Sequence, residues 1–181
     1  FFTGEIVNAP NMPWPGIIPM ARLAGDALKL KATLTNDANA AAIGEMAYGA
    51  ARGMKDFIIV TLGTGVGSGF VTNGQVIYGH DGFAGELGHV IAVRDGRKCG
   101  CGRNGCLETY ASATGIVVTA EQWLTERNTT TILNEYKGRI TAKLINEAAE
   151  HGDALALEIF AYTGKILGQT LADMVAITSP E

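Results

Sequence analysis

Apolar and polar positions divide the chain into a β-rich centre and a helical C-terminal part. Residues 57–62 form a continuous apolar run, which predicts a buried strand. Strand-like runs at 70–72 and 75–78 flank Asn73-Gly74, a pair that favours a two-residue hairpin turn. We therefore expect three consecutive antiparallel strands, with residues 63–69 as a glycine-rich turn after the first.

Helical spacing of apolar residues predicts most of the other elements. One long helix is expected over residues 153–177, with one face formed by Leu155, Ile159, Tyr162, Ile166, Thr170 and Met174. Shorter helices are expected over 23–30, 107–123 and 140–150, and a short buried strand over 32–35. An alanine-rich helix would begin at Asp37 as its cap and end near Gly53, with Gly44 and Gly49 marking close backbone neighbours. Strands followed by helices indicate a layered α/β domain.

Composition narrows the class of protein. The chain has 181 residues, is 47% hydrophobic and 18% charged, and carries a net charge of -4, which is ordinary for a globular protein. The negative charge argues against nucleic-acid binding by phosphate neutralisation, and no apolar run has the length of a membrane span. The abrupt ends, the first without Met, suggest an internal piece of a longer protein.

The four residues His89, Cys99, Cys101 and Cys106 have the spacing of a metal site. Three thiolates and one imidazole are the ligands of a closed tetrahedral zinc site, which would be structural because no coordination position stays open. The alternative is a set of reduced cysteines with an unrelated histidine. The odd number of cysteines favours a reducing, cytoplasmic setting over disulfides. The second ring nitrogen of His89 would remain free to bond a substrate hydroxyl.

The glycine-rich run 61–69 has two interpretations. Glycines let backbone N–H groups crowd around an anion, so the run favours a phosphate site, but an ordinary glycine-rich hairpin fits as well. It matches neither the Walker A loop nor the dinucleotide fingerprint.

Asn36-Asp37 and the two glutamates Glu86 and Glu108 are the remaining candidates. Asp37 is either a helix cap or a general base that takes a proton from an attacking hydroxyl. Two carboxylates, an amide and an imidazole around one cleft would suit a polyol. A paired-carboxylate glycosidase is the alternative, and the phosphate-type glycine run argues against it.

Three sequence blocks together resemble the ROK family of bacterial sugar kinases and related repressors, and within it the glucokinases. The blocks are TNDANAAAIGE from residue 35, TLGTGVGSGFVTNGQVIYGHDGFAGELGH from residue 61 and CGCGRNGCLETYAS from residue 99, and residues 9–14 match a further upstream segment. The resemblance implies an actin-like ATPase fold with ribonuclease-H-like halves. Residues 1–36 would end the N-terminal α/β domain, and 37–181 would form most of the second domain, with a zinc loop at 85–108.

The resemblance also implies roles for individual residues. Asp37 would be the catalytic base, and the sugar hydroxyls would be bound by Asn36, Asp37, Glu86, His89 and Glu108. Gly63, Thr64 and Gly65 would line the nucleotide phosphates. His89 and the three cysteines would hold structural Zn²⁺. ATP with Mg²⁺, a cytoplasmic location and a homodimer or homotetramer are expected as well.

The resulting hypothesis is ATP-dependent phosphorylation of a hexose, with glucose to glucose 6-phosphate as the leading reaction. The alternatives are a sugar-sensing repressor of the same family, and a kinase for fructose, mannose, allose or an N-acetylated hexosamine. A plain zinc-stabilised binding module is a third hypothesis, but it leaves Asn36-Asp37 and the glycine run without a role. The family's Asp-x-Gly-Gly-Thr and Gly-Gly segments are absent from these residues, so we expect this chain alone not to phosphorylate sugar.

Overall fold

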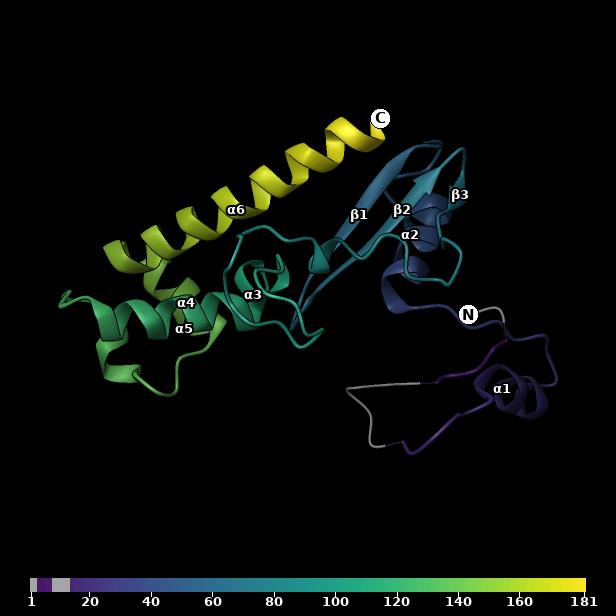
Figure 1. Cartoon of the computed structure of the whole chain (residues 1–181), viewed down its shortest axis with the longest axis horizontal. Coiled ribbons are helices and arrows are strands. Elements are labelled where there is room, and N and C mark those ends of the chain that lie inside the picture. The colour runs from purple at the N-terminus through teal and green to yellow at the C-terminus, as the bar shows by residue number, and fades with distance from the viewer. Residues whose placement is uncertain (1–2, 8–13) are drawn as a thin grey trace.

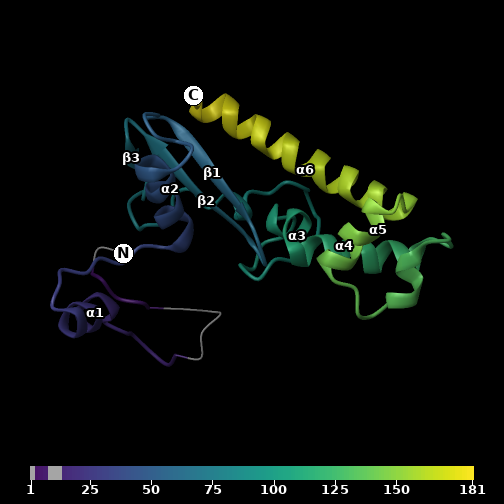
Figure 2. The same cartoon turned by 180° about the vertical axis from the view of Figure 1, so that it is seen from behind.

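The computed structural model describes residues 3–7 and 14–181. Of the upstream segment 9–14 that resembles the family, all but Trp14 lies outside the described residues. Figure 1 shows a three-stranded sheet near the middle, a group of helices beyond one end and α1 set apart beyond the other, and the reverse view agrees (Figure 2). None of the helices among the described residues has both the length and the hydropathy of a membrane span.

The predicted antiparallel sheet is confirmed. Its strands are β1 (Phe57–Leu62), β2 (Val66–Thr72) and β3 (Gln75–Val76), in the order β1-β2-β3. Asn73 and Gly74 have φ of 50° and 72°, as a tight hairpin turn of the mirror-image type requires. The predicted glycine-rich turn is shorter than expected, because only residues 63–65 connect the strands while Gly67 and Gly69 belong to β2. These two strand glycines have a packing role.

Helix α2 (Asp37–Tyr48) lies on one face of the sheet, where Gly67 and Gly69 let it approach closely. A Cβ at Gly69 would lie 2.7 Å from the Cβ of Ala42. The ends of α2 correct two predictions. Its cap is Asn36, whose side chain accepts a hydrogen bond from the N–H three residues on, and it ends at Gly49 because that backbone leaves the helical region.

The expected close neighbours of the two α2 glycines are only partly found. Gly44 has open space around its Cα, so the prediction of a close backbone neighbour there was wrong. At Gly49 the atoms nearest to an added Cβ all belong to Glu45 of the same helix. The close approach between α2 and the sheet is instead made by glycines of the strand.

The other face of the sheet is covered by the second half of the long helix α6 (Ala154–Thr178). This long helix confirms the predicted one to within a residue at each end. Five residues of its expected face pack in the core clusters, and the sixth, Thr170, is buried. Its first half closes a separate core with three elements: α4 (Ala113–Glu126), η2 (Ile132–Tyr136) and α5 (Ala142–Glu150). The sheet therefore lies between α2 and α6 (Figure 1).

Three further predictions need correction. The helix expected over 107–123 is divided into α3 (Glu108–Ala111) and α4, because Ser112 is extended and its hydroxyl caps α4. Helix α1 (Met20–Leu28) begins and ends earlier than predicted, since Lys29 turns to a φ of +56°. Residues 31–36 form no strand, because no strand in the described part of the chain pairs with them and a lone extended segment has no ladder. The domain division after residue 36 stays a prediction.

Candidate functional site

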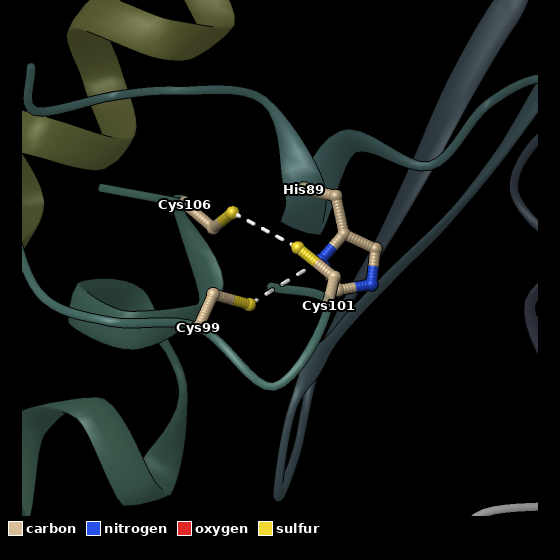
Figure 3. A group of neighbouring side chains, drawn as sticks. All are labelled: His89, Cys99, Cys101 and Cys106. Carbon is tan, nitrogen blue, oxygen red and sulfur yellow. Dashed lines mark hydrogen bonds between the residues drawn. The ribbon is translucent and has the colours of Figure 1, made fainter. Parts of the chain in front are cut away.

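The four predicted metal ligands lie together, as Figure 3 shows. Their ligand atoms are all within 4.8 Å of one another. The Sγ of Cys99 is 3.7 Å from Nδ1 of His89, and the Sγ atoms of Cys101 and Cys106 are 3.6 Å apart. Zinc–sulfur bonds of about 2.3 Å in a tetrahedron separate the ligands by roughly 3.8 Å. The spacing therefore fits a single tetrahedral ion.

The thiols differ in their electrostatic setting. Hydrogen bonds from the backbone and then the side chain of Arg103 lower the pKa of Cys101 to about 6. Burial raises the pKa of Cys106 to about 12. A buried thiol with a high pKa does not ionise by itself at neutral pH, and a bound divalent cation is the usual means of making it a thiolate. The guanidinium of Arg103 also donates to the carbonyl of His89 over 2.7 Å.

Glu108, the first residue of α3, contacts both the sheet and the group of four predicted metal ligands. Its Oε2 accepts a hydrogen bond of 3.3 Å from the backbone N–H of Val66, the first residue of β2. Its Oε1 lies 3.8 Å from the Sγ of Cys99. A Cβ at Gly65 would collide with the Glu108 carboxylate, so glycine at this position allows the close approach. The carboxylate of Glu108 thus contacts both the glycine-rich run 61–69 and the predicted ligand Cys99.

The short helix η1 (Leu87–His89) is fixed to the same part of β2 by a buried hydroxyl. Ser68 is 5% exposed, donates to the carbonyl of Gly85 and accepts a 2.9 Å hydrogen bond from the N–H of Leu87. A Cβ on Gly88 would collide with the carbonyl of Val66. This packing sets the position of η1, which ends with His89.

Asn36 and Asp37 are placed by the packing of α2 on the opposite face of the strand. A Cβ at Gly67 would lie 3.2 Å from the Cβ of Ala38, so the first turn of α2 lies against the beginning of β2. The carboxylate of Asp37 is exposed and accepts a 2.9 Å hydrogen bond from the N–H of Ala38. At the first position of a helix an ionised carboxylate is stabilised by the helix dipole.

The turn at residues 63–65, called the glycine turn below, is tied to the start of α4. The carbonyl of Gly63 accepts from the N–H of Ala113 over 2.8 Å, and the carbonyl of Thr64 accepts from the hydroxyl of Thr114 over 2.9 Å. In a trans peptide the N–H points opposite to the carbonyl of the same unit. The N–H groups of Thr64 and Gly65 therefore point away from the groups of α4 that bind these carbonyls.

Comparison with known proteins identifies the family. The profile of the ROK family matches residues 3–181. The chain belongs to the ROK family. A glucokinase of Halalkalibacterium halodurans is 41% identical over 182 residues, which cover 99% of this chain and 55% of the relative. The chain thus spans about half the length of the curated relatives it matches.

Two solved ROK structures resemble the fold closely. A ROK glucokinase from Streptomyces griseus, in complex with glucose and AMPPNP, superposes with a TM-score of 0.82 at 37% identity, over 98% of this chain and 58% of that one. A ROK transcriptional regulator, a homologue of the E. coli MLC protein, superposes with a TM-score of 0.85 at 28% identity, over 99% and 45%. The mixed α/β fold is therefore that of ROK proteins, both kinases and regulators.

The structure places most of the predicted site residues around the first half of β2. Glu108 and η1 contact this half of the strand, and the first turn of α2 lies on the face opposite to η1, since neighbouring strand residues point to opposite faces. No hydrogen bond in the described part of the chain joins the side chains of Asn36 or Asp37 to those of Glu86, His89 or Glu108. Glu86 itself is exposed.

Sequence reasoning missed two supporting residues. Ser68 positions η1 through its hydrogen bonds to the backbone of Gly85 and Leu87. The sequence signal that could have indicated it is a polar residue in the middle of a glycine-rich strand. Arg103 lies between two of the cysteines, and its charge beside predicted thiolates was a second signal. The grouping of His89 and the three cysteines could be predicted from spacing alone because these residues are close in sequence.

Proposed function

We propose that the whole protein is an ATP-dependent sugar kinase that phosphorylates a hexose, with glucose as the first candidate. The glucokinase relative and the glucose complex of the S. griseus enzyme support this choice. The proposal concerns the whole protein because the chain spans 55% of the glucokinase relative. The observation that supports it most directly is one of position. The first turn of α2, the short helix η1, Glu108 and the glycine turn all lie beside the first half of β2.

Asp37 is proposed as the general base. Its carboxylate is exposed at the start of α2, and only one of its oxygens has a hydrogen bond within the helix. A carboxylate within reach of the sugar's 6-hydroxyl accepts the proton as that oxygen attacks the γ-phosphorus.

The sugar's other hydroxyls are proposed to bind Asn36, Glu86, His89 and Glu108. The Asn36 Oδ1 caps α2, which leaves its amide N–H groups as donors. Val66 takes Oε2 of Glu108, and Oε1, which lies 3.8 Å from the Sγ of Cys99, would accept from a sugar hydroxyl when Cys99 binds the metal as a thiolate. In Figure 3 the second ring nitrogen of His89 points away from the thiols, so it is turned outward to donate to a hydroxyl.

The nucleotide phosphates are proposed to bind Gly63, Thr64 and Gly65. The outward N–H groups of Thr64 and Gly65 and the nearby N-terminus of α4 favour negative charge at this place. Mg²⁺ bound with the nucleotide would neutralise charge on the transferred phosphoryl group. The division of roles puts phosphates at the glycine turn and the sugar beyond it.

Zinc is proposed as the ion held by His89, Cys99, Cys101 and Cys106. The donor set and the 3.6–3.7 Å ligand separations fit tetrahedral Zn²⁺. With four protein ligands it would supply rigidity to the loop and leave no position for substrate. A cytoplasmic location and a homodimer or homotetramer remain predictions for the whole protein.

The test is a hexose panel with the full-length protein and ATP. We expect phosphorylation of at least one of glucose, mannose, fructose, allose and N-acetylglucosamine, with the highest kcat/KM for glucose. ADP release would be measured with and without each sugar, so that plain ATPase activity is distinguished. No sugar-dependent ADP release with any of the five would contradict the proposal.

The second candidate is a sugar-sensing repressor. It is favoured by the ROK regulator, whose TM-score of 0.85 is as high as that of the kinase. A repressor keeps the sugar site but needs no general base. Sequence-specific DNA binding by the full-length protein that is released by a hexose, without turnover, would favour this candidate over the kinase.

A further inference from the structure

A second cleft lies away from the candidate site, between α4, α6 and residues that lead into the cysteines. Its volume is about 710 Å³, within the range of small-molecule sites. Figure 1 shows α6 passing alongside α4 there, and both helices contribute to the lining. None of the predicted sugar, phosphate or metal ligands lines this cleft. We call it the α4–α6 cleft.

The α4–α6 cleft is positive although the chain as a whole is negative. Its lining includes three cations, Arg97, Arg127 and Lys165, and one carboxylate, Glu158. The cleft therefore carries a net charge of +2, in a chain whose net charge is -4. Cations gathered in a concave site raise the local concentration of anions.

Arg97 supplies a fixed charge that is paired with no carboxylate among residues 3–7 and 14–181. Its guanidinium is half-buried and lies 4.5 Å from the centre of the Tyr110 ring. Its hydrogen bonds, between 2.8 and 3.3 Å, go to neutral acceptors only: the carbonyls of Thr109 and Gly115, the hydroxyl of Thr119 and the amide oxygen of Gln122. Burial lowers the pKa of Arg97 from its ordinary value, yet arginine stays charged at neutral pH. Arg97 thus contributes a field and has few donors left for a ligand.

Arg127 and Lys165 differ from Arg97 and from each other. Arg127 is held by stacking 3.8 Å over the ring of Trp123 and by an ion pair of 2.8 Å with Glu158. Lys165 has no carboxylate partner in the part of the chain that the structure describes. A lysine on a flexible stem beside a fixed arginine is a common way to hold a phosphate group.

We propose that the α4–α6 cleft binds a phosphate group, either free or as the terminal group of a small molecule. The phosphate, with a charge near -2, contacts Lys165 and Arg127 in the field of Arg97, and the rest of the molecule lies against the ring of Tyr162. Tyr162 packs on Trp123 with ring centres 5.3 Å apart, so this wall is rigid. The proposal does not rest on kinase activity, because none of the proposed catalytic groups takes part.

The experiment is calorimetric titration of the full-length protein with three separate probes: inorganic phosphate, a hexose 6-phosphate and ATP. We expect Lys165→Glu to weaken binding of at least one probe by about tenfold or more, since it reverses a charge at the site. Lys165→Arg keeps the charge and should bind within about threefold of the parent. Lys143→Glu, an exposed lysine on α5, is the matched control and should leave binding unchanged.

The probes distinguish the sources of the phosphate group. Equal affinity for inorganic phosphate and hexose 6-phosphate assigns the cleft to free phosphate, and a clear preference for either organic probe assigns it to that compound. Thermal unfolding of each variant checks that the fold is kept. Unchanged affinity of Lys165→Glu for all three probes would overturn the proposal, as would an equal loss in Lys143→Glu, which would indicate a bulk charge effect. This readout is independent of turnover.

Discussion

The cysteine loop and the glycine turn both lie beside the candidate site, but they are held in place differently. The cysteine loop, residues 85–108, is anchored by fully buried Leu87 and Leu107, while most residues between 94 and 104 are exposed. Backbone hydrogen bonds, such as those from Cys99 N–H to the Arg103 carbonyl and from Gly105 N–H to the Arg97 carbonyl, shape its exposed part, and the loop adds four side chains with the geometry of metal ligands. The glycine turn, by contrast, is held by backbone and hydroxyl hydrogen bonds to α4 and needs no ligand for its shape.

From this difference we infer which substitutions would disrupt each region. The cysteine loop should keep its structure when residues beside the four predicted ligands are substituted. It should lose that structure when one of the four ligand side chains is removed. The glycine turn should tolerate loss of the metal but fail when a Cβ is added at Gly65, where it would meet the Glu108 carboxylate. Glu108, which belongs to the cysteine loop, lies against Gly65 of the glycine turn and bonds the N–H of Val66 beside it, so it links the two regions.

The largest expected effect separates chemistry from both regions. Asp37→Asn should lower kcat by about 10³-fold, because the amide keeps the shape of the carboxylate but accepts no proton. Hexose affinity should stay within about tenfold, and metal content should not change. Steady-state kinetics with the full-length protein measure this, with Asp173→Asn on α6 as the control. Turnover near that of the parent would exclude Asp37 as the base.

The next effect breaks the cysteine loop and spares the glycine turn. Cys106→Ser should reduce zinc from about one ion per chain to a small fraction, since it removes one of four ligands. The KM for hexose should then rise by about tenfold or more, while the KM for ATP changes much less. Elemental analysis and kinetics give the two readouts.

Chelation of the parent protein should reproduce that result, and added Zn²⁺ should restore the KM for hexose. A parent protein that contains no metal and is unaffected by chelators would refute the zinc site. A change in the KM for ATP as large as that for hexose would show that the two regions are not separate.

A third change enters both regions at once. Gly65→Ala places a methyl group against the Glu108 carboxylate, which must move away from the N–H of Val66. We expect kcat/KM to fall by about 10- to 100-fold, because displacement of a binding group by about 1 Å is costly. Gly44→Ala on α2, where the added Cβ has open space, is the matched control. Equal activity of the two variants would exclude the contact between Glu108 and the turn.

The sequence predicted what is local and missed what depends on distant neighbours. The Asn73-Gly74 hairpin and the buried face of α6 followed from residue type and spacing, as did the gathering of four ligands within eighteen residues. The choice between Asn36 and Asp37 as cap could not be made, because both side chains suit the position and backbone geometry decides. The contact of Glu108 with Val66 spans 42 residues and exists only in the folded chain.

The smallest expected effect tests the glycine turn alone. Thr114→Val removes the hydroxyl that holds the Thr64 carbonyl over 2.9 Å and keeps the shape of the side chain. The loss of one such bond costs about 1 kcal/mol, which corresponds to a roughly fivefold rise in the KM for ATP. Thr125→Val removes a hydroxyl from the same helix that bonds only within it, and is the control. Because the cysteine loop does not contact Thr114 through a hydrogen bond, zinc content and the KM for hexose should not change. A larger effect on hexose than on ATP would place the sugar, and not the phosphates, beside the turn, and would reverse the roles assigned to the two regions.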